Sequence, residues 1–389
     1  MDTKLRAWWS HRQGLDGSLM GRSARDVLHQ TGWSRSVGGA SPYLTLFARA
    51  GLRRAEVDAD LASLKIHELP SARGCTYVVP ADDYPLALKV GQNFSAKTEI
   101  ATAKKLGVTD AEVSKLRAAV LKALDAEPLD PDAVRAKVGN AARNLGPEGV
   151  NKGLTTTLPL ALGLLQSEGE IRRLPVNGRI DQQRYKYARW KPNPLAKWKL
   201  DMDASFAELA RHYYRWIGAA AIGEFQWFSG LGVKAAKLAT DPLKLVPLQG
   251  DLMALPEDRD AFEKFQVPKK PHYVLTGILD NISHLRRATA SLIAPEDRDC
   301  DLVRDGGLSD FAHHAILDRG RLVGLWHFDP ETGDIAWNSF VKKDRSLEEA
   351  VARTESFIRE DLGDARTFSL DSPKSRVPAI AALRKAAAG

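Results

Sequence analysis

The sequence has little cysteine and no long apolar run, and both shortages exclude classes of protein. Cys75 and Cys300 are the two cysteines in 389 residues. Thiols this far apart in sequence offer neither the close spacing of a zinc site nor a disulfide framework, so we expect a reducing compartment. The longest apolar run, "LPLALGLL", is far too short to span a membrane. The first residues also lack the apolar stretch of a signal peptide, so the sequence predicts a soluble, cytoplasmic protein without membrane contacts.

Familiar enzyme motifs are missing as well. The stretch "GPEGVNKG" has glycines and a lysine, but not in the order of a phosphate-binding loop. "WFSGLG" lacks the glycine two residues before Ser229 that a nucleophile elbow requires. His313 and His314 are adjacent, so in a strand they would point to opposite faces, one buried and one solvated. We expect no metal ion and no organic cofactor.

Positive charge is present in moderate excess. Lysine and arginine number 56 against 49 acidic residues, which gives a formal net charge of +7. Such a balance permits attraction to phosphates but does not require it. Hydrophobic residues make up 44% of the chain, enough for the cores of several domains.

The positive charge is concentrated in one short segment, "EIRRLPVNGRIDQQRYKYARW" at residues 170–190. The segment predicts two strands joined by a two-residue type I′ turn at Asn177 and Gly178. Two readings stay open: the basic side chains contact nucleic acid, or they keep an exposed ribbon soluble and protect its edges. Under the first reading, the predicted nucleic-acid contacts on this hairpin are Arg172, Arg173, Arg179, Arg184 and Lys186.

Three predicted helices precede the hairpin. Thr109 and Glu112 form the capping box of the first, and Asp130 caps the second. The third, within "TTTLPLALGLLQSEG", is apolar almost all round, which is typical of a core helix and not of a helix that reads the major groove. Three helices followed by a hairpin is the element order of a winged helix. If this unit binds DNA, we expect its contacts at the wing and at the N-terminus of the third helix.

The rest of the chain predicts related units. Residues 203–218 are amphipathic with Asp203 as a candidate cap, and two short helices around Ser229 have the shape of a helix-turn-helix. Strand-like segments separated by turn residues follow from about residue 270, and then a helix that ends at Gly363. Three tryptophans, Trp8, Trp9 and Trp227, are assigned to the core. The predicted fold class is α+β: tandem winged-helix domains (residues 1–97, 98–195 and 196–265) followed by a C-terminal β-barrel-like subdomain with a terminal helix (266–389).

Three stretches resemble the winged-helix DNA glycosylases of the AlkZ and YcaQ type, which are bacterial proteins with tandem winged helices and a C-terminal β-barrel. "TGWSRSVGGASPYLTLFARAG" is similar to the family's Gly-Leu-Gln-x-Gln segment followed by Asp-Pro-Tyr-Leu-x-Leu. "ARGCTYVVPADDY" resembles its Arg-Gly-Thr-Leu-His-Leu-Val-Pro-x-x-Asp-Tyr. "ELARHYYRWIGAAAIGEFQWFSGLGVKAA" resembles its third winged helix. The resemblance covers most of the chain in order, and it implies a DNA-repair function.

The resemblance also implies a site. In the family, a Gln-x-Gln or Gln-x-Asp pair positions the water that attacks the sugar as an alkylated base leaves. Ser34 and Ser36 occupy the matching positions here, and serine can orient a water but carries no charge. Arg35 lies between them and would oppose a cationic sugar if it pointed inward. Gln30 precedes Ser34 by four residues, so a helix would place it on the same face as a substitute. The family's histidine is replaced by Tyr77, whereas Arg73 is retained, and we include Arg35 and Arg73 among the predicted DNA contacts.

Three functions follow from these patterns. The first is a DNA glycosylase, a hydrolase of N-glycosidic bonds, that acts as a monomer on alkylated bases in double-stranded DNA. The second is a DNA-binding or regulatory protein of the same fold that lost the catalytic pair. The third is a scaffold that binds a protein partner, with the basic hairpin merely solvated. Salt-dependent DNA binding would exclude the third.

Overall fold

The first 95 residues fold into helices around a small antiparallel sheet. In the computed structural model the described residues are 2–95, 97–182, 184–298, 300–304 and 311–388. The sheet has the strand order β1-β3-β2, so the short β1 is an edge strand and β3 is central. The elements of this part are α1 (Thr3–Arg12), α2 (Ala24–Thr31), β1 (Ser34–Arg35), α3 (Ser41–Ala50), α4 (Arg54–Ala62), β2 (Ile66–Pro70), β3 (Thr76–Pro80) and α5 (Tyr84–Gln92).

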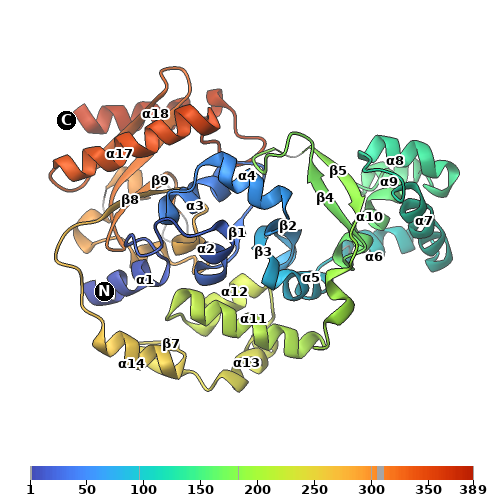
Figure 1. Ribbon diagram of the computed structural model, residues 1–389, viewed down its shortest axis with the longest axis horizontal. Coiled ribbons are helices and arrows are strands. Elements are labelled where there is room, and N and C mark those ends of the chain that lie inside the picture. The colour runs from blue at the N-terminus through green and yellow to red at the C-terminus, as the bar shows by residue number, and fades with distance from the viewer. Residues whose placement is uncertain (1, 96, 183, 299, 305–310, 389) are drawn as a thin grey trace.

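A lobe of helices and one hairpin stands at one end of the molecule (Figure 1). We call residues 97–190 the helical lobe and the remainder the body. The lobe contains α6 (Lys97–Lys105), α7 (Asp110–Ala123), α8 (Pro131–Val138), α9 (Gly146–Asn151), α10 (Leu158–Ser167), β4 (Ile171–Pro175) and β5 (Tyr185–Arg189). The Thr109–Glu112 capping box and the Asp130 cap are confirmed by hydrogen bonds to the first turns of α7 and α8.

The predicted two-residue turn of the hairpin is wrong. The last strand pair is Pro175 with Tyr185, so the connection between the two strands is longer than two residues. Gly178 does turn the chain, with a φ of 75° and its N–H donated to the Pro175 carbonyl, but the strands do not close there. The reason is Ile180, an apolar side chain that is fully buried in a core of the body. Burying it draws the loop away from the ribbon, because leaving an isoleucine exposed forfeits roughly 1.5–3 kcal/mol.

Helix α10 is a core helix, as predicted. Its apolar residues supply two separate cores of the lobe: Leu162 and Leu165 join the one formed with α7 and α8, and Leu160 joins the one formed with α6. A helix that packs against two cores buries most of its surface, and this explains why α10 is apolar on nearly all sides. Its N-terminus is not open to a phosphate, because Thr156 and Thr157 are buried and Thr157 exchanges hydrogen bonds with Arg143.

Residues 202–264 run along one side of the body as three helices, a hairpin and a fourth helix. Helix α11 is capped by Asp201, not by Asp203 as predicted, because the Asp201 side chain accepts the Ala204 N–H. Gly230 ends α12 with a φ of 73°, which confirms the turn after Ser229. The elements are α11 (Met202–Ile217), α12 (Ile222–Ser229), α13 (Val233–Thr240), β6 (Val246–Gln249), β7 (Leu252–Ala254) and α14 (Pro256–Lys264).

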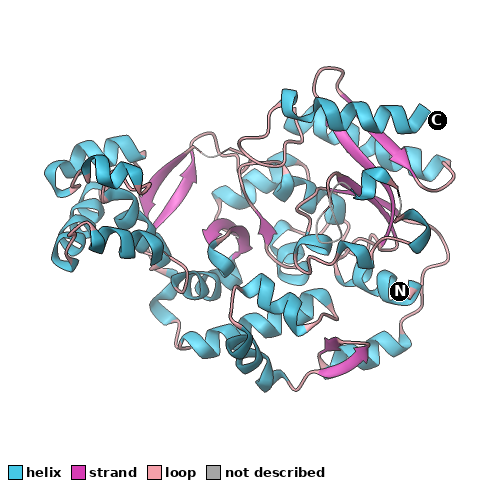
Figure 2. Cartoon of the chain, turned by 180° about the vertical axis from the view of Figure 1, so that it is seen from behind, coloured by secondary structure: helices cyan, strands magenta, loops and turns pink. Residues whose placement is uncertain are grey.

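The C-terminal sheet is open, so the predicted barrel is wrong. Its order is β11-β10-β9-β8, and within the described residues β8 and β11 are not paired with each other. Helices α17 and α18 lie together beside it, as Figures 1 and 2 show from opposite sides. The predicted helix end at Gly363 is confirmed. The elements are β8 (Tyr273–Thr276), α15 (Asn281–His284), α16 (Asp301–Arg304), β9 (His314–Asp318), β10 (Arg321–Asp329), β11 (Asp334–Ser339), α17 (Arg345–Phe357) and α18 (Pro373–Ala388).

The expectation for the adjacent histidines, one buried and one solvated, needs correction. His313 and His314 are both buried, at 4% and 2% exposure. His313 precedes β9 and His314 begins it, and α18 packs against the neighbouring strands β10 and β11. His314 accepts the Ile278 N–H through Nδ1. Cys75 and Cys300 are both free thiols. Within the described residues there is no helix of a length and apolarity able to cross a membrane, and no cluster of three or more potential metal ligands.

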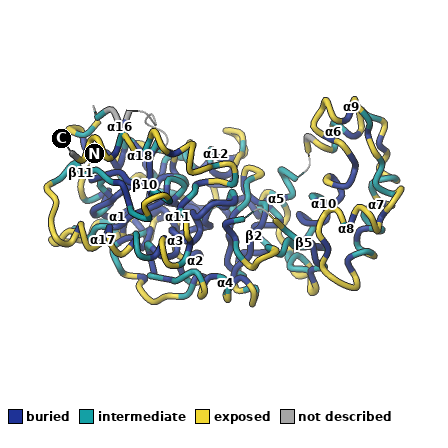
Figure 3. Tube along the Cα trace, turned by 90° about the horizontal axis from the view of Figure 1, so that it is seen from above, coloured by how far each residue is buried: buried dark blue, intermediate teal, exposed yellow. Residues whose placement is uncertain are grey.

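The cores show how the segments join. Two large cores belong to the body, and each combines residues from the first 95 residues with residues of the C-terminal part. Residues 202–264 contribute to the larger one. The two cores of the lobe, by contrast, draw only on residues 100–187. Buried chain is correspondingly continuous through the body and forms a separate patch in the lobe (Figure 3). The domain boundaries at 97, 195 and 265 stay predictions.

Candidate functional site

The sheet of the first 95 residues sorts the sequence-predicted residues onto two faces. Ser34 pairs with Val78, and Val78 pairs with Glu68, so these three side chains lie in a row on one face. Ser36 follows two residues after Ser34 and lies on that face too. Arg35 pairs with Tyr77 and lies on the opposite face. The two serines are therefore together, as predicted, and the charge of Arg35 is directed away from them.

The serine face also carries a carboxylate, Glu68, that was not among the predicted site residues. Ser36 Oγ donates a hydrogen bond of 2.5 Å to Glu68 Oε1. Ser34, Ser36 and Glu68 are buried, with exposures of 0%, 2% and 3%. Neither Ser34 Oγ nor Glu68 Oε2 makes a hydrogen bond of good geometry with any described residue. Burial raises the pKa of Glu68, and the Ser36 hydrogen bond, the charge of Arg173 and a hydrogen bond from the Tyr185 hydroxyl offset part of that rise.

The hairpin of the lobe covers this face. Arg173 on β4 lies over the ring of Tyr185 on β5, with its guanidinium 5.0 Å from the ring centroid. Both side chains lie close enough to Glu68 to alter its pKa. On the other face of β2, His67 packs edge-on against Trp190 at the end of the hairpin. Burial, followed by the charges of Arg172 and Arg173, lowers the pKa of His67 to about 3, so this ring is neutral.

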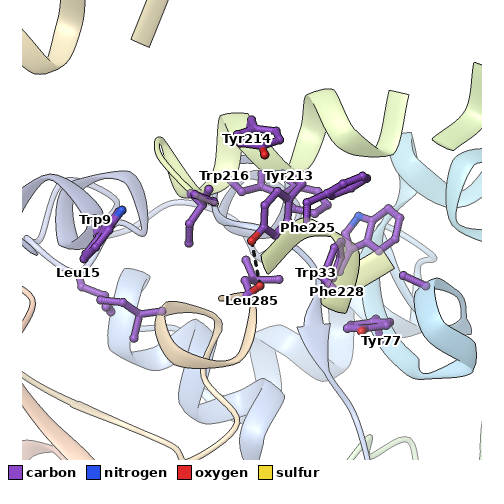
Figure 4. Close-up of a cluster of buried hydrophobic side chains, with 14 of the residues drawn as sticks. Trp9, Leu15, Trp33, Tyr77, Tyr213, Tyr214, Trp216, Phe225, Phe228 and Leu285 are labelled. Carbon is purple, nitrogen blue, oxygen red and sulfur yellow. Dashed lines mark hydrogen bonds between the residues drawn. The ribbon is translucent and has the colours of Figure 1, made fainter. Parts of the chain in front are cut away.

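The opposite face rests on the largest aromatic cluster of the body. Tyr77 contacts Trp33 and Phe228 edge-on, at centroid distances of 6.2 and 6.0 Å. Figure 4 shows these rings with Tyr213, whose hydroxyl donates to the Leu285 carbonyl. Arg35 lies 5.6 Å above the ring of Tyr77 and donates to the Thr76 carbonyl. The tyrosine that replaces the family's histidine is thus a packing residue, buried at 2% exposure.

Two arginines and a tryptophan form an exposed patch beside that cluster. The Arg73 guanidinium lies 4.1 Å from the centroid of the Trp227 ring, and Arg287 lies 5.4 Å from it. Both arginines are exposed and have positive φ, 58° and 52°. Trp227 is partly buried against the large core, so its assignment to the core holds only for one side of the ring. We call Arg73, Trp227 and Arg287 the Arg–Trp patch.

The five predicted hairpin cations have different surroundings. Arg179 is engaged internally, because it forms an ion pair with Asp181 and donates to the Leu362 carbonyl. Arg172 and Arg173 are half-buried against the body. Arg184 and Lys186 are exposed and form no ion pair with any described residue. Only these last two match the expectation of free cations on a ribbon.

Gln30 is not positioned as the sequence reasoning expected. Helix α2 ends at Thr31, so Ser34 is in a strand and the four-residue helical spacing does not apply. The Gln30 side chain is exposed and lines a surface hollow of about 520 Å³ together with Arg22 and Arg215. Neither serine lines that hollow. Gln30 therefore does not join the serine face.

Comparison with known proteins shows which family this chain resembles. The family model described as "DNA glycosylase AlkZ-like" matches residues 27–357. The chain belongs to the AlkZ-like DNA glycosylase family. Among solved structures, the DNA glycosylase AlkZ of Streptomyces sahachiroi superimposes with a TM-score of 0.70 at 18% identity, over 94% of this chain and 98% of that one. A search of curated proteins found no match.

Membership in the AlkZ-like family confirms the resemblance drawn from the sequence, and the superposition shows that 94% of the chain shares the fold. At 18% identity the likeness carries the fold alone. What the sequence reasoning missed is Glu68 and Arg287. Glu68 lies in "IHELP", where alternating apolar and polar residues indicate a strand. The local sequence does not show that β3 places this strand in line with β1. Arg287 follows a short helix, and nothing in its local pattern indicates that it meets Trp227.

Proposed function

We propose that this AlkZ-like protein is a DNA-repair glycosylase that hydrolyses the N-glycosidic bond of alkylated bases. The observation that carries the proposal is the serine face: two hydroxyls at the positions of the family's water-positioning pair share that face with a buried carboxylate. Leaving of a cationic base develops positive charge on the sugar, and a preorganised carboxylate stabilises that charge. Glu68 thus supplies, from the same sheet, the negative charge that the two serines lack.

We assign DNA contact to two surfaces. Arg184 and Lys186 on the hairpin are exposed cations without partners among the described residues, as phosphate contacts require. The Arg–Trp patch adds two guanidinium groups over an indole, a combination suited to phosphate and base contacts at a distorted nucleotide. Arg35 stays a predicted contact, since its guanidinium is only half-buried above Tyr77. Monomeric action on duplex DNA is part of the proposal.

The second candidate is a DNA-binding protein without glycosylase activity. One observation favours it: Ser34 and Ser36 are buried beneath the hairpin, and neither serine lines the surface hollow beside Gln30 or the one beside Arg6. A fold that kept its DNA contacts and closed over its former site would look like this. The AlkZ-like fold is common to both candidates.

The deciding experiment is single-turnover release of base from duplex DNA that contains N7-alkylated guanine, with enzyme in excess. The Ser34→Ala, Ser36→Ala double variant is measured in parallel. We expect the wild-type protein to exceed the uncatalysed rate and the variant to lose most of that excess. Absence of release by the wild type, with salt-sensitive binding intact, would establish the non-catalytic DNA binder. Binding that does not respond to salt would favour the protein-scaffold reading instead.

A further inference from the structure

Ser34 and Ser36 supply neither a proton acceptor nor a negative charge. A hydroxyl can orient a water molecule, but it neither removes a proton efficiently nor stabilises a positive charge. The residues that perform those tasks must therefore come from elsewhere in the fold. Among the described residues, Glu68 is the carboxylate that contacts the pair, through its 2.5 Å hydrogen bond with Ser36.

The location of Glu68 suits such a role. It lies on β2, one strand beyond β3, yet register places it in line with Ser34 across Val78. Its Oε1 accepts the hydrogen bond of Ser36, and the Tyr185 hydroxyl lies near enough to the carboxylate to act on its pKa by hydrogen bonding. Glu68 Oε2 and the Ser34 hydroxyl are buried polar atoms that make no hydrogen bond of good geometry with any described residue. Buried polar atoms are rarely left unsatisfied, so two of them on one small face indicate a polar guest. A water molecule held by both atoms fits that requirement.

We propose that Glu68 is the general base of the reaction, which extends the function proposed above and rests on it. In the step, the bond between C1′ of the deoxyribose and the base nitrogen breaks, and its electron pair stays with the base, whose positive charge it neutralises. A water oxygen, oriented by Ser34 and Ser36, forms the new bond to C1′. The proton that this water loses goes to Glu68 Oε2. The co-reactant is water alone, and neither oxidation nor reduction occurs.

Access to Glu68 depends on the hairpin. Arg173 on β4 and Tyr185 on β5 are the charged and titratable groups that face the carboxylate. Strand β1 contributes the Ser36 hydroxyl, and β3 contributes the apolar Val78. The damaged nucleotide reaches the carboxylate when Arg173 and Tyr185 move aside. Arg173 is then available to a phosphate, which links DNA binding to exposure of the base.

The test compares wild type, Glu68→Gln and Glu68→Asp in the single-turnover assay. Glutamine preserves the shape and the Ser36 contact but cannot take a proton, so we expect release at least about 100-fold slower. Aspartate should restore part of the rate. The control is Glu170→Gln, which removes a carboxylate at the start of the same hairpin, where it binds Asn193, and should leave release unchanged. Thermal melting and salt-dependent DNA binding, measured on each variant, confirm that the fold persists.

A pH profile separates catalysis from a structural role. Because burial raises the pKa of Glu68 above that of an ordinary glutamate, wild-type release should fall as the solution is made acidic and should begin to fall above the ordinary glutamate range, whereas release by Glu68→Gln should be flat over the same acidic range. Unchanged release by Glu68→Gln would overturn the inference and leave the glycosylase assignment standing. No release by the wild type would overturn both. If Glu68→Gln does not fold, a wild-type rate independent of pH over that range overturns the inference.

Discussion

At the scale of single residues, Arg49 and Asp280 form a fully buried ion pair in the body. Arg49 donates to both carboxylate oxygens of Asp280, at 2.7 and 2.8 Å, and both side chains are fully buried. The same guanidinium donates to Gln13 Oε1 and to the Thr45 carbonyl, so α3 is tied to α1 and to the loop before α15. The pair therefore fixes the relation of the first helices to the C-terminal part.

Removing one partner of this pair should be costly. In Arg49→Met the Asp280 carboxylate stays buried without its counter-charge, and we expect the free energy of unfolding to fall by about 3–5 kcal/mol. Urea denaturation followed by circular dichroism measures it. The exposed Arg345–Glu349 pair supplies the control, because Arg345→Met should leave the transition where it is. Equal transitions for wild type and Arg49→Met would show that the body does not depend on the pair.

We expect His212 to make the protein less stable at alkaline pH. Burial lowers its pKa, but hydrogen bonds to Asp83 and Glu208 and their charges outweigh burial and raise it to about 9. Its unfolded pKa is near 6.5, so its stabilisation is complete below pH 6.5 and is lost as the pH rises through about 9. We expect the free energy of unfolding to decrease by up to about 3 kcal/mol across this window, and His212→Gln to remove most of that decrease. Urea titrations at pH 6 and pH 9.5 test this; the same decrease in both proteins would assign it to other groups.

At the scale of elements, the hairpin has an inner and an outer set of cations. Arg184 and Lys186 are exposed, whereas Arg172, Arg173 and Arg179 pack against the body or pair internally. We expect the double variant Arg184→Gln, Lys186→Gln to reduce the slope of log affinity against log salt by about 2, since each lost phosphate contact contributes about 0.9. Fluorescence anisotropy with labelled duplex measures the slope.

A matched control for that variant lies on α18. Lys374 and Lys385 are exposed, and replacing both by glutamine removes the same charge from a helix at the far end of the body (Figure 1). Its slope should equal that of the wild type. If both double variants reduce the slope equally, DNA responds to net charge and the hairpin has no special part in binding.

Elements also show where sequence reasoning succeeds and fails. Local chemistry predicted the Thr109 capping box, the Asp130 cap and the helix end at Gly363, because each depends on residues within one or two turns. The hairpin turn failed because the burial of Ile180 in the body outweighed the turn preference of Asn177 and Gly178. Glu68 was missed for a related reason. Its contact with Ser36 requires three strands to be in register, and register is set by long-range packing.

At the scale of the whole molecule, the helical lobe has cores of its own and the body has shared ones. We expect hydrogen exchange to show the lobe opening as a separate cooperative unit. Leu165→Ala, in a lobe core, should speed exchange within residues 97–190 alone. Phe225→Ala, in the large core, should speed exchange in the body. Faster exchange throughout the chain in both variants would mean that lobe and body unfold together.

The helical lobe is attached to the body at several points along the hairpin. The lobe is fastened at its base, where Gln92 and Ser95 donate to carbonyls of α10, and again at the loop, where the Ile180 N–H donates to the Tyr43 hydroxyl. Between these two ends, Arg179 donates to the Leu362 carbonyl and Trp190 packs against His67. Arg173 and Tyr185 lie over Glu68 along this same attached hairpin. Uncovering the serine face therefore requires displacement of a ribbon that is held at both of its ends, so the ribbon must bow outward rather than swing free.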